Sequence, residues 1–245
     1  MYFYDLIKQY SPKFIFIQEI WLSYSDSHIL TKDFPSYTFQ VSTPDMFTHP
    51  EDILTSHGHT WHGVALGWHN DLCSQVTPLD SGYERFAAAR VTLNSETFLI
   101  ISLYAPTSGK DDEFLECFTH LSNFLNENRT KEEPIVIGTD SNCSEKSTSR
   151  RKNMFSNFCS AFSLTVCSTN LPTFHHSNQT LESCIDFLLI SKSSTTHLSQ
   201  IQQLCKFDHP TNLSSHDVLL SSVKTRIPSV ESKPSLYNDT YSDFD

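Results

Sequence analysis

Two polar side chains that could perform phosphate chemistry follow an apolar run near the middle of the chain. The run at 135–137 leads to Asp140, and Asn142 comes two residues later. Such a run is typical of a buried strand, and the spacing places both side chains on one side if the strand continues. A carboxylate can hold a cation or activate water, and an amide can donate to a phosphate oxygen. An ordinary turn after a strand has the same composition, so the interpretation depends on the other strand ends.

Four further polar residues stand beside other apolar runs: Glu19, Tyr104, Asp186 and His216. An acid is costly to bury alone, so Glu19 and Asp186 each predict a cation or a hydrogen-bonding partner. Tyr104 comes just before Pro106, which ends a strand and predicts an exposed ring there, with ordinary packing at the sheet edge as the alternative. Cleavage of a phosphodiester needs a cation, a positioned water, a donor to the phosphate and an oriented imidazole. The set contains a residue for each of these tasks.

The elements that must position these residues are strands and amphipathic helices in mixed order. Apolar residues at helical spacing predict a helix over 111–128, and shorter helices are expected over 3–10 and 152–162. Strands are predicted at 14–18, 37–41, 63–68, 74–77, 86–93, 98–103, 135–139, 164–167, 184–190 and 197–205. This mixture predicts two packed sheets with helices outside them, in one domain over 1–224. Residues 225–245 have the composition of a flexible tail or linker.

Composition narrows the class of protein. The 245 residues include 18 Phe and 9 Tyr, enough for a sizeable core. No apolar run is long enough to cross a membrane, and the first residues do not form a signal peptide. Seven scattered cysteines favour reduced thiols inside the cell, and we expect the nucleus in preference to the cytoplasm.

The charge and the histidines leave two questions open. A net charge of −11 is not typical of a nucleic-acid binder, so DNA contacts would need local cations. The one compact basic cluster, at 150–152, could be such a contact or a solvated helix start. The segment 42–62 contains His49, His57, His59 and His62. Their spacing resembles a metal site, but with no cysteine nearby an exposed loop is favoured.

In this order the segments resemble the endonuclease/exonuclease/phosphatase superfamily, most closely the apurinic-site-type endonuclease domain of non-LTR (LINE-type) retrotransposons. The resemblance covers roughly residues 10–224 and rests on QEIWL at 18–22, GVA at 63–65, SLYAP at 102–106, GTDSN at 138–142, PTF at 172–174, IDF at 185–187 and SSH at 214–216. Each segment is weak alone, but seven in order are specific. The resemblance implies an α/β (α+β) four-layer sandwich, in which two packed, mostly antiparallel β-sheets are flanked by helices.

The resemblance also implies roles for the metal-binding and phosphate-binding residues. Glu19 matches the metal-binding glutamate of the family, with Mg²⁺ as the expected ion and Mn²⁺ as the alternative. Asp140 matches the aspartate that aligns or deprotonates the attacking water. Asn142 matches the amide that holds the phosphate, and Tyr104 matches the phosphate-contacting tyrosine.

The last two matches form a pair. His216 matches the catalytic histidine, and Asp186 matches the aspartate that orients it. A buried acid beside an imidazole fixes its tautomer and favours its charged form, which helps to stabilise a pentavalent phosphate. The expected partner is DNA, with no membrane and no obligate protein partner.

Two departures from the family pattern predict a weakened metal site. The first strand of the family and its active-site asparagine precede the helix with which this chain begins, so both are expected to be missing. Ser215 stands where the family has a metal-contacting aspartate, and Asp217 would face away from His216 on a strand.

Three functions therefore remain open. The first is a Mg²⁺-dependent, DNA-nicking endonuclease of a retrotransposon. The second is a catalytically impaired remnant that only binds DNA. The third is a phosphatase or phosphodiesterase of the same superfamily that acts on lipids or inositol phosphates, although no basic pocket for several phosphates is apparent.

Overall fold

The computed structural model describes residues 2–47, 62–130, 133–144, 147–169, 171–175, 182–192, 197–198, 201–204 and 214–224. The predicted tail at 225–245 lies outside the described residues, as do His49, His57 and His59. None of the described helices is long and apolar enough to cross a membrane.

The structure contains two main sheets and four α-helices among its described residues. The helices are α1 (Tyr2–Tyr10), α2 (His28–Asp33), α4 (Asp111–Asn128) and α5 (Arg150–Ala161). The smaller sheet has the order β1-β3-β2, from β1 (Phe14–Gln18), β2 (Tyr37–Ser42) and β3 (Val64–His69). The larger sheet has the order β4-β5-β6-β7-β11-β8, from β4 (Val76–Leu79), β5 (Phe86–Leu93), β6 (Glu96–Tyr104), β7 (Ile135–Asp140), β8 (Leu164–Cys167) and β11 (Asp186–Ser191).

Three pairs of two-residue strands and two short 3-10 helices complete the described elements. The strand pairs are β9 (Phe174–His175) with β10 (Glu182–Ser183), β12 (His197–Leu198) with β15 (Val223–Lys224), and β13 (Gln202–Gln203) with β14 (Leu219–Leu220). The 3-10 helices are η1 (Pro44–Met46) and η2 (Asn70–Leu72). Within the strand predicted at 197–205 the structure describes two short strands, β12 and β13, whose partners both lie in 219–224.

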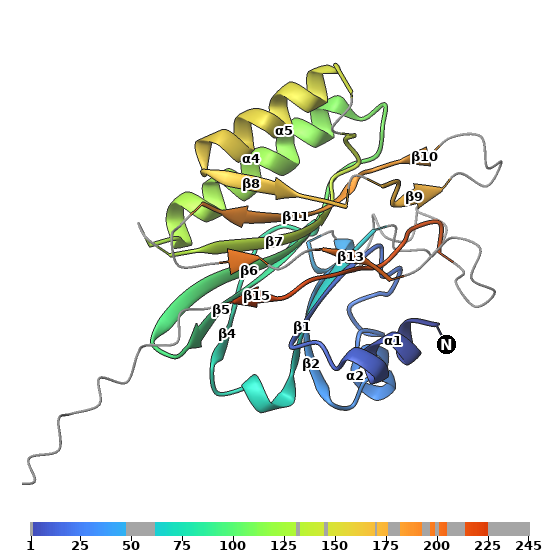
Figure 1. Cartoon of the computed structure of the whole chain (residues 1–245), viewed down its shortest axis with the longest axis vertical. Coiled ribbons are helices and arrows are strands. Elements are labelled where there is room, and N and C mark those ends of the chain that lie inside the picture. The colour runs from blue at the N-terminus through green and yellow to red at the C-terminus, as the bar shows by residue number, and fades with distance from the viewer. Residues whose placement is uncertain are drawn as a thin grey trace, which may run out of the picture.

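The elements form four layers, which confirms the predicted sandwich. In Figure 1, α4 and α5 cover the outer face of the larger sheet, and α1 and α2 lie beside the smaller sheet. One apolar core fills the space between the larger sheet and its helices, a second lies between the two sheets, and a third joins α1 to the smaller sheet. Among the described strand pairs, only β6 and β7 run parallel.

Side-chain alternation along β6 and β7 decides which residues face the site. Leu99 and Ile101 pack in the core under the helices, whereas Ile100 and Tyr104 pack in the core between the sheets. In β7, Val136 also faces the space between the sheets. Because successive side chains in a strand point to opposite faces, Asp140 shares the face of Val136 and is turned toward the smaller sheet.

The helix start predicted at the basic cluster 150–152 is present, because α5 begins at exposed Arg150, but Arg151 is buried and not solvated. Its guanidinium donates to one carboxylate and four backbone carbonyls: Asp111 Oδ1 (2.8 Å), Pro106 O (3.0 Å), Thr107 O (2.6 Å), Lys110 O (3.1 Å) and Asn142 O (3.3 Å). It also lies over the ring of Phe114. Arg151 thus ties the loop after β6 to the loop after β7, the two loops beside the candidate site.

We expect Arg151→Met to destabilise the fold by roughly 3 kcal/mol, because it leaves buried polar groups without their partner. Lys152→Met removes the same charge from a half-buried neighbour and should change stability far less. Chemical denaturation of both variants measures the difference. Equal stability of the two variants would show that Arg151 does not hold the loops.

Candidate active site

Strand register brings three of the predicted residues to one edge of the larger sheet. Tyr104, at the end of β6, lies opposite Asp140, at the end of the parallel strand β7. Asp186 begins the antiparallel strand β11 and also lies opposite Asp140. A parallel pair places both strand ends together, and an antiparallel pair places an end beside a start. The three side chains therefore meet although 82 residues separate the first from the last.

Glu19 reaches the same place from the smaller sheet. The two sheets approach closely under the site, where a Cβ added to Gly138 would lie 2.5 Å from Cγ of Phe16. Gln18 bridges the sheets there, because its Nε2 donates to Oγ of Ser102 (3.1 Å) and to the carbonyl of Gly138 (3.3 Å). Glu19 follows this bridge and is held at the edge of the inter-sheet space.

Asp140 and Asn142 are brought together by a turn and not by a continued strand. β7 ends at Asp140, and Asn142 has a φ of 46°, a left-handed conformation that asparagine tolerates. The backbone N–H of Asn142 donates to Oδ1 of Asp140 (3.0 Å), and its Nδ2 donates to Oδ2 (3.3 Å) and to the carbonyl of Ala105 (2.8 Å). The strand does not continue to Asn142, so the turn that the sequence left open is present, and this turn brings the two side chains together.

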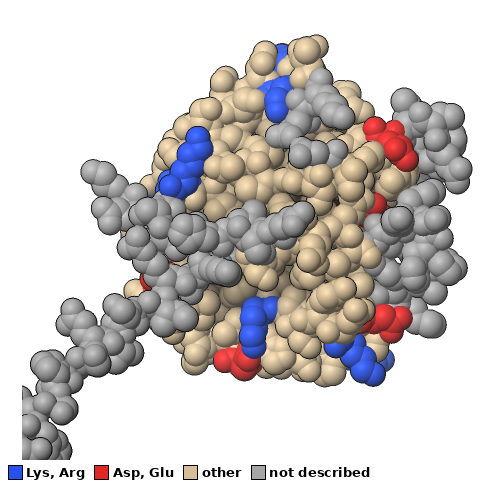
Figure 2. Space-filling model, in the orientation of Figure 1, with Lys and Arg blue, Asp and Glu red and all other residues tan. Residues whose placement is uncertain are grey.

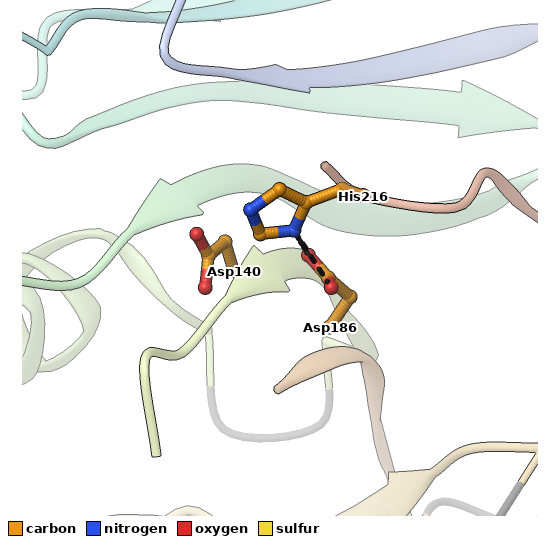
Figure 3. A group of neighbouring side chains, drawn as sticks. All are labelled: Asp140, Asp186 and His216. Carbon is orange, nitrogen blue, oxygen red and sulfur yellow. Dashed lines mark hydrogen bonds and ion pairs between the residues drawn. The ribbon is translucent and has the colours of Figure 1, made fainter. Parts of the chain in front are cut away.

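His216 lies between two carboxylates, as Figure 3 shows. Its Nδ1 is 3.0 Å from Oδ2 and 3.2 Å from Oδ1 of Asp186, while the carboxylate of Asp140 lies toward the other ring nitrogen. Burial by itself lowers the pKa of His216, but the hydrogen bond that its Nδ1–H donates to Asp186 and the charges of Asp186, Asp140 and Glu19 outweigh it and raise the pKa to about 9. The imidazole is therefore charged at neutral pH.

Asp140 has a pKa well above its usual range. The main cause is its burial, since the residue is only 3% exposed, and the second is the charge of Asp186. His216 and the backbone N–H of Asn142 act in the opposite direction without outweighing these effects. A carboxylate of this kind accepts a proton more readily than an exposed one, which is what a base for an attacking water needs.

The prediction of an exposed Tyr104 is wrong. The ring is 1% exposed because it belongs to the core between the sheets. Its hydroxyl donates to Oε1 of Glu19 at 2.5 Å, and the ring of His62 stacks on it with centroids 5.5 Å apart. The exposed loop favoured for the histidine segment does not hold at His62, which is half-buried against Tyr104. Tyr104 thus orients Glu19, and His62 covers Tyr104.

Several residues at the site adopt backbone conformations that are uncommon for their types. Glu19 has a φ of 53°, Trp21 of 52° and His62 of 82°. The backbone N–H of Trp21 donates to the carbonyl of His62 at 3.3 Å, so these residues belong to one hydrogen-bonded corner. Backbone strain of this kind concentrates at functional sites, where the surroundings hold it in place.

We expect His62 to make the fold less stable under mild acid. Burial, followed by the nearby charges of Arg85 and Lys110, lowers the pKa of His62 from 6.5 to about 4. Between these values the unfolded chain binds a proton at this residue and the folded chain does not, so stability falls as the pH drops from 6.5 to 4.

His62→Gln should remove this contribution. The stability of the variant relative to the wild type should rise as the pH is lowered through that window, which denaturation at a series of pH values measures. His28→Gln changes an exposed histidine of α2 and serves as the control. A stability difference between His62→Gln and wild type that does not depend on pH would contradict the low pKa.

A divalent cation fits the charge of the site. Ligand atoms of Asp140, Asp186 and His216 lie within 4.8 Å of one another, which makes them a candidate metal group among the described residues. His216 is the weakest ligand of the three, because it holds a proton at neutral pH and metals bind the neutral ring. Hard cations prefer carboxylates, so Asp140 and the nearby Glu19 are the better fit. A cation there would also relieve the repulsion between Asp140 and Asp186.

The two residues that flank His216 differ in what the structure records. The backbone carbonyl of Ser215 accepts a hydrogen bond from the backbone N–H of His175 (2.9 Å). Asp217 is buried and lies 3.1 Å from Nε2 of His175, so its carboxylate does not bond to His216. This agrees with the predicted alternation of side chains.

Comparison with known proteins identifies the family. A family model described as endonuclease-reverse transcriptase matches residues 98–219, the part of the chain that carries Tyr104, Asp140, Asn142, Asp186 and His216. The endonuclease/exonuclease/phosphatase from Bacteroides vulgatus has the same fold, with a TM-score of 0.69, 13% identity, and coverage of 92% of this chain and 89% of that chain. The chain belongs to the endonuclease/exonuclease/phosphatase superfamily. It is thus a hydrolase of that superfamily, whose members generally use divalent metal ions.

Other solved structures of the superfamily show how varied its activities are. The endonuclease domain of TRAS1, a telomere-specific non-LTR retrotransposon, has a TM-score of 0.63 and 12% identity, with coverage of 91% of this chain and 90% of that chain. The mannosyl-6-phosphatase of Bacteroides thetaiotaomicron has a TM-score of 0.64 and 14% identity, with coverage of 91% and 89%. No curated protein matches the chain by sequence. At these identities the structures establish the fold, and the substrate must be inferred from the site.

Proposed function

We propose that the protein is a metal-dependent DNA endonuclease that nicks one strand, of the kind found in non-LTR retrotransposons. The observation that carries the proposal is the convergence of Asp140, Asn142, Asp186 and His216 at one edge of the larger sheet, with Glu19 beside them. The match to an endonuclease-reverse transcriptase model and the likeness to a retrotransposon endonuclease domain support this branch.

The residues of the site suggest how cleavage would proceed. Asp140 takes the proton of the attacking water, because its raised pKa makes it an effective base. The amide of Asn142, which already faces Asp140, donates to a phosphate oxygen. His216, charged and oriented by Asp186, stabilises the negative charge that develops on the phosphate.

Glu19 would hold the metal ion. The hydroxyl of Tyr104 fixes one carboxylate oxygen of Glu19 by donating a hydrogen bond to it. A bound Mg²⁺ or Mn²⁺ would supply charge stabilisation at a phosphate oxygen. The hydrogen bond from Tyr104 leaves the other carboxylate oxygen of Glu19 for this purpose. The resemblance implies that Tyr104 contacts the phosphate directly. Because Tyr104 is buried, we propose instead that its role is to orient Glu19.

The surface charge bears on the choice between DNA and small phosphate esters. Figure 2 shows Lys and Arg scattered singly on the face drawn, without a basic patch among the described residues. Multiply phosphorylated lipids or inositols are held by clustered cations, and the face drawn offers no such cluster among the described residues. A DNA strand can be held with fewer phosphate contacts, at the cost of weak binding. We therefore expect a nuclease with a low affinity for DNA. We also propose that it acts in the nucleus, where its substrate lies.

A substrate panel tests the proposal. We expect the purified chain to nick double-stranded DNA in the presence of Mg²⁺, and to release little phosphate from inositol phosphates or from mannose 6-phosphate. Asp112→Ala, which changes an exposed acid in the first turn of α4, serves as the matched active control. Phosphate release from the small esters without DNA nicking would favour the phosphatase alternative. DNA binding without any cleavage would favour the impaired remnant.

A further inference from the structure

A second histidine–aspartate pair lies directly behind His216. The Nε2 atom of His175, in β9, is 3.1 Å from Oδ2 of Asp217, and Nε2 of Gln203 donates to the same oxygen. The side chains of His175 and Asp217 are 14% and 1% exposed. Because Asp217 follows His216 in the chain, this buried pair is one residue away from the candidate catalytic imidazole.

The backbone joins the pair to His216. Phe174 and His216 form an antiparallel bridge, closed by hydrogen bonds from the N–H of His175 to the carbonyl of Ser215 (2.9 Å) and from the N–H of Asp217 to the carbonyl of Thr173 (2.8 Å). Side chains alternate across such a bridge. The rings of Phe174 and His216 meet on its front face, 4.9 Å apart, and His175 meets Asp217 on the back.

Stability alone does not account for the charge of Asp217. Its Oδ1 atom is buried and has no hydrogen-bond partner among the residues that the structure describes. A buried carboxylate with one unsatisfied oxygen is costly, and an apolar pair of the same size would hold the bridge at a lower cost. The carboxylate makes a directional hydrogen bond to His175. This bond restricts how the segment with Phe174 can lie against the segment with His216.

We propose that His175 and Asp217 are a positioning pair, which holds His216 in the orientation that bonds to Asp186 during phosphodiester cleavage. The expected effect on the rate of DNA nicking rests on the proposed function, whereas the expected effect on the orientation of His216 does not. Among the described residues His216 lies in an isolated bridge with Phe174, and both this bridge and the bond to Asp186 help to orient its ring. The pair contacts no reacting group and acts through the placement of His216.

Two variants test the pair. Asp217→Ala removes the carboxylate, and His175→Phe keeps an aromatic ring but removes both nitrogens. The first readout is the low-field proton NMR signal of the Nδ1–H of His216, assigned by its absence in His216→Gln. The second is kcat and KM for DNA nicking. Asp71→Ala is the matched control, because it breaks an exposed histidine–aspartate pair, His69–Asp71 (2.8 Å), in another part of the fold.

We expect both variants to lose or broaden the low-field signal of His216. In each, kcat should fall by about 10-fold or more with KM nearly unchanged, since a small displacement of a catalytic group is enough to slow the reaction by such factors. The double variant should be no slower than the slower single variant. Asp71→Ala should change neither readout. Asp217→Asn keeps an acceptor oxygen toward His175 and should retain the signal.

The outcomes separate positioning from simple stabilisation. If the variants melt at lower temperature but their folded forms keep the signal and the wild-type kcat, the proposal is overturned. If Asp217→Ala does not fold, the proposal is still tested by His175→Phe, which should lose the signal, against Asp217→Asn, which should keep it. The signal is recorded without substrate, so a wild type that nicks no DNA would refute the proposed function while the NMR comparison still decides on the pair.

Discussion

We expect Asp140→Asn to abolish DNA nicking and, in the absence of metal, to raise the melting temperature at neutral pH. The loss of activity should be on the order of 10²- to 10⁴-fold, because the variant removes the group that accepts the proton of the attacking water. The gain in stability has a separate cause. The pKa of Asp140 is raised by its burial and by the charge of Asp186.

The sign of the stability change follows from proton binding. Above the usual pKa of an aspartate, 3.8, the unfolded chain releases the proton of Asp140 more readily than the folded chain does. Stability therefore declines as the pH rises toward the folded pKa, and an amide avoids this decline. Nicking assays and melting curves at pH 7 with a chelator measure both effects, with Asp112→Ala as the control. An inactive variant that is also less stable would show that Asp140 has a structural role instead.

The second large effect concerns His216 and Asp186 as a unit. His216→Ala should slow nicking by on the order of 10²- to 10⁴-fold, and Asp186→Asn should slow it in the same direction. Because Asp186 acts through the imidazole, to which it bonds at 3.0 Å, the double variant should be little worse than the worse single one. Fully additive losses would separate the two residues and contradict the pair.

The same pair predicts the alkaline limit of activity. The charged form of His216 persists up to its pKa of about 9, so the rate should fall above that pH. Asp186→Asn removes the hydrogen-bonding carboxylate that raises this pKa, and the limit should move to lower pH. A pH–rate profile of wild type and variant measures the shift. Identical profiles would mean that the proton on His216 does not limit the reaction.

The positions of the site residues at strand ends were predictable from the sequence, because apolar runs of strand length end at Glu19, Tyr104 and Asp140. A pattern of this kind predicts where a strand ends. It does not predict which strands pair, so only the structure shows that Asp186 lies opposite Asp140. The helix at 111–128 was predicted with its observed bounds because its apolar residues keep helical spacing over five turns.

The features that the sequence did not reveal depend on long-range contacts. Pro106 suggested an exposed Tyr104, but the smaller sheet and His62 cover that ring. The sequence predicted that Arg151 is a surface cation. Its hydrogen-bond acceptors lie in loops about 10 to 45 residues away in the chain, so its burial could not be predicted from its neighbours. His175 gave no signal at all, because its partner, Asp217, is 42 residues distant. Burial and partner identity are set by packing, which local composition does not encode.

The central claim is that the group at the end of β7 cleaves DNA with the help of a divalent cation. The most direct test is the conversion of supercoiled plasmid to the open-circular form by the wild-type chain and by Asp140→Asn, each with Mg²⁺ and with a chelator. The account predicts nicking by the wild type with Mg²⁺, and none in the other three reactions. Equal nicking by wild type and variant, or nicking that survives the chelator, would contradict it.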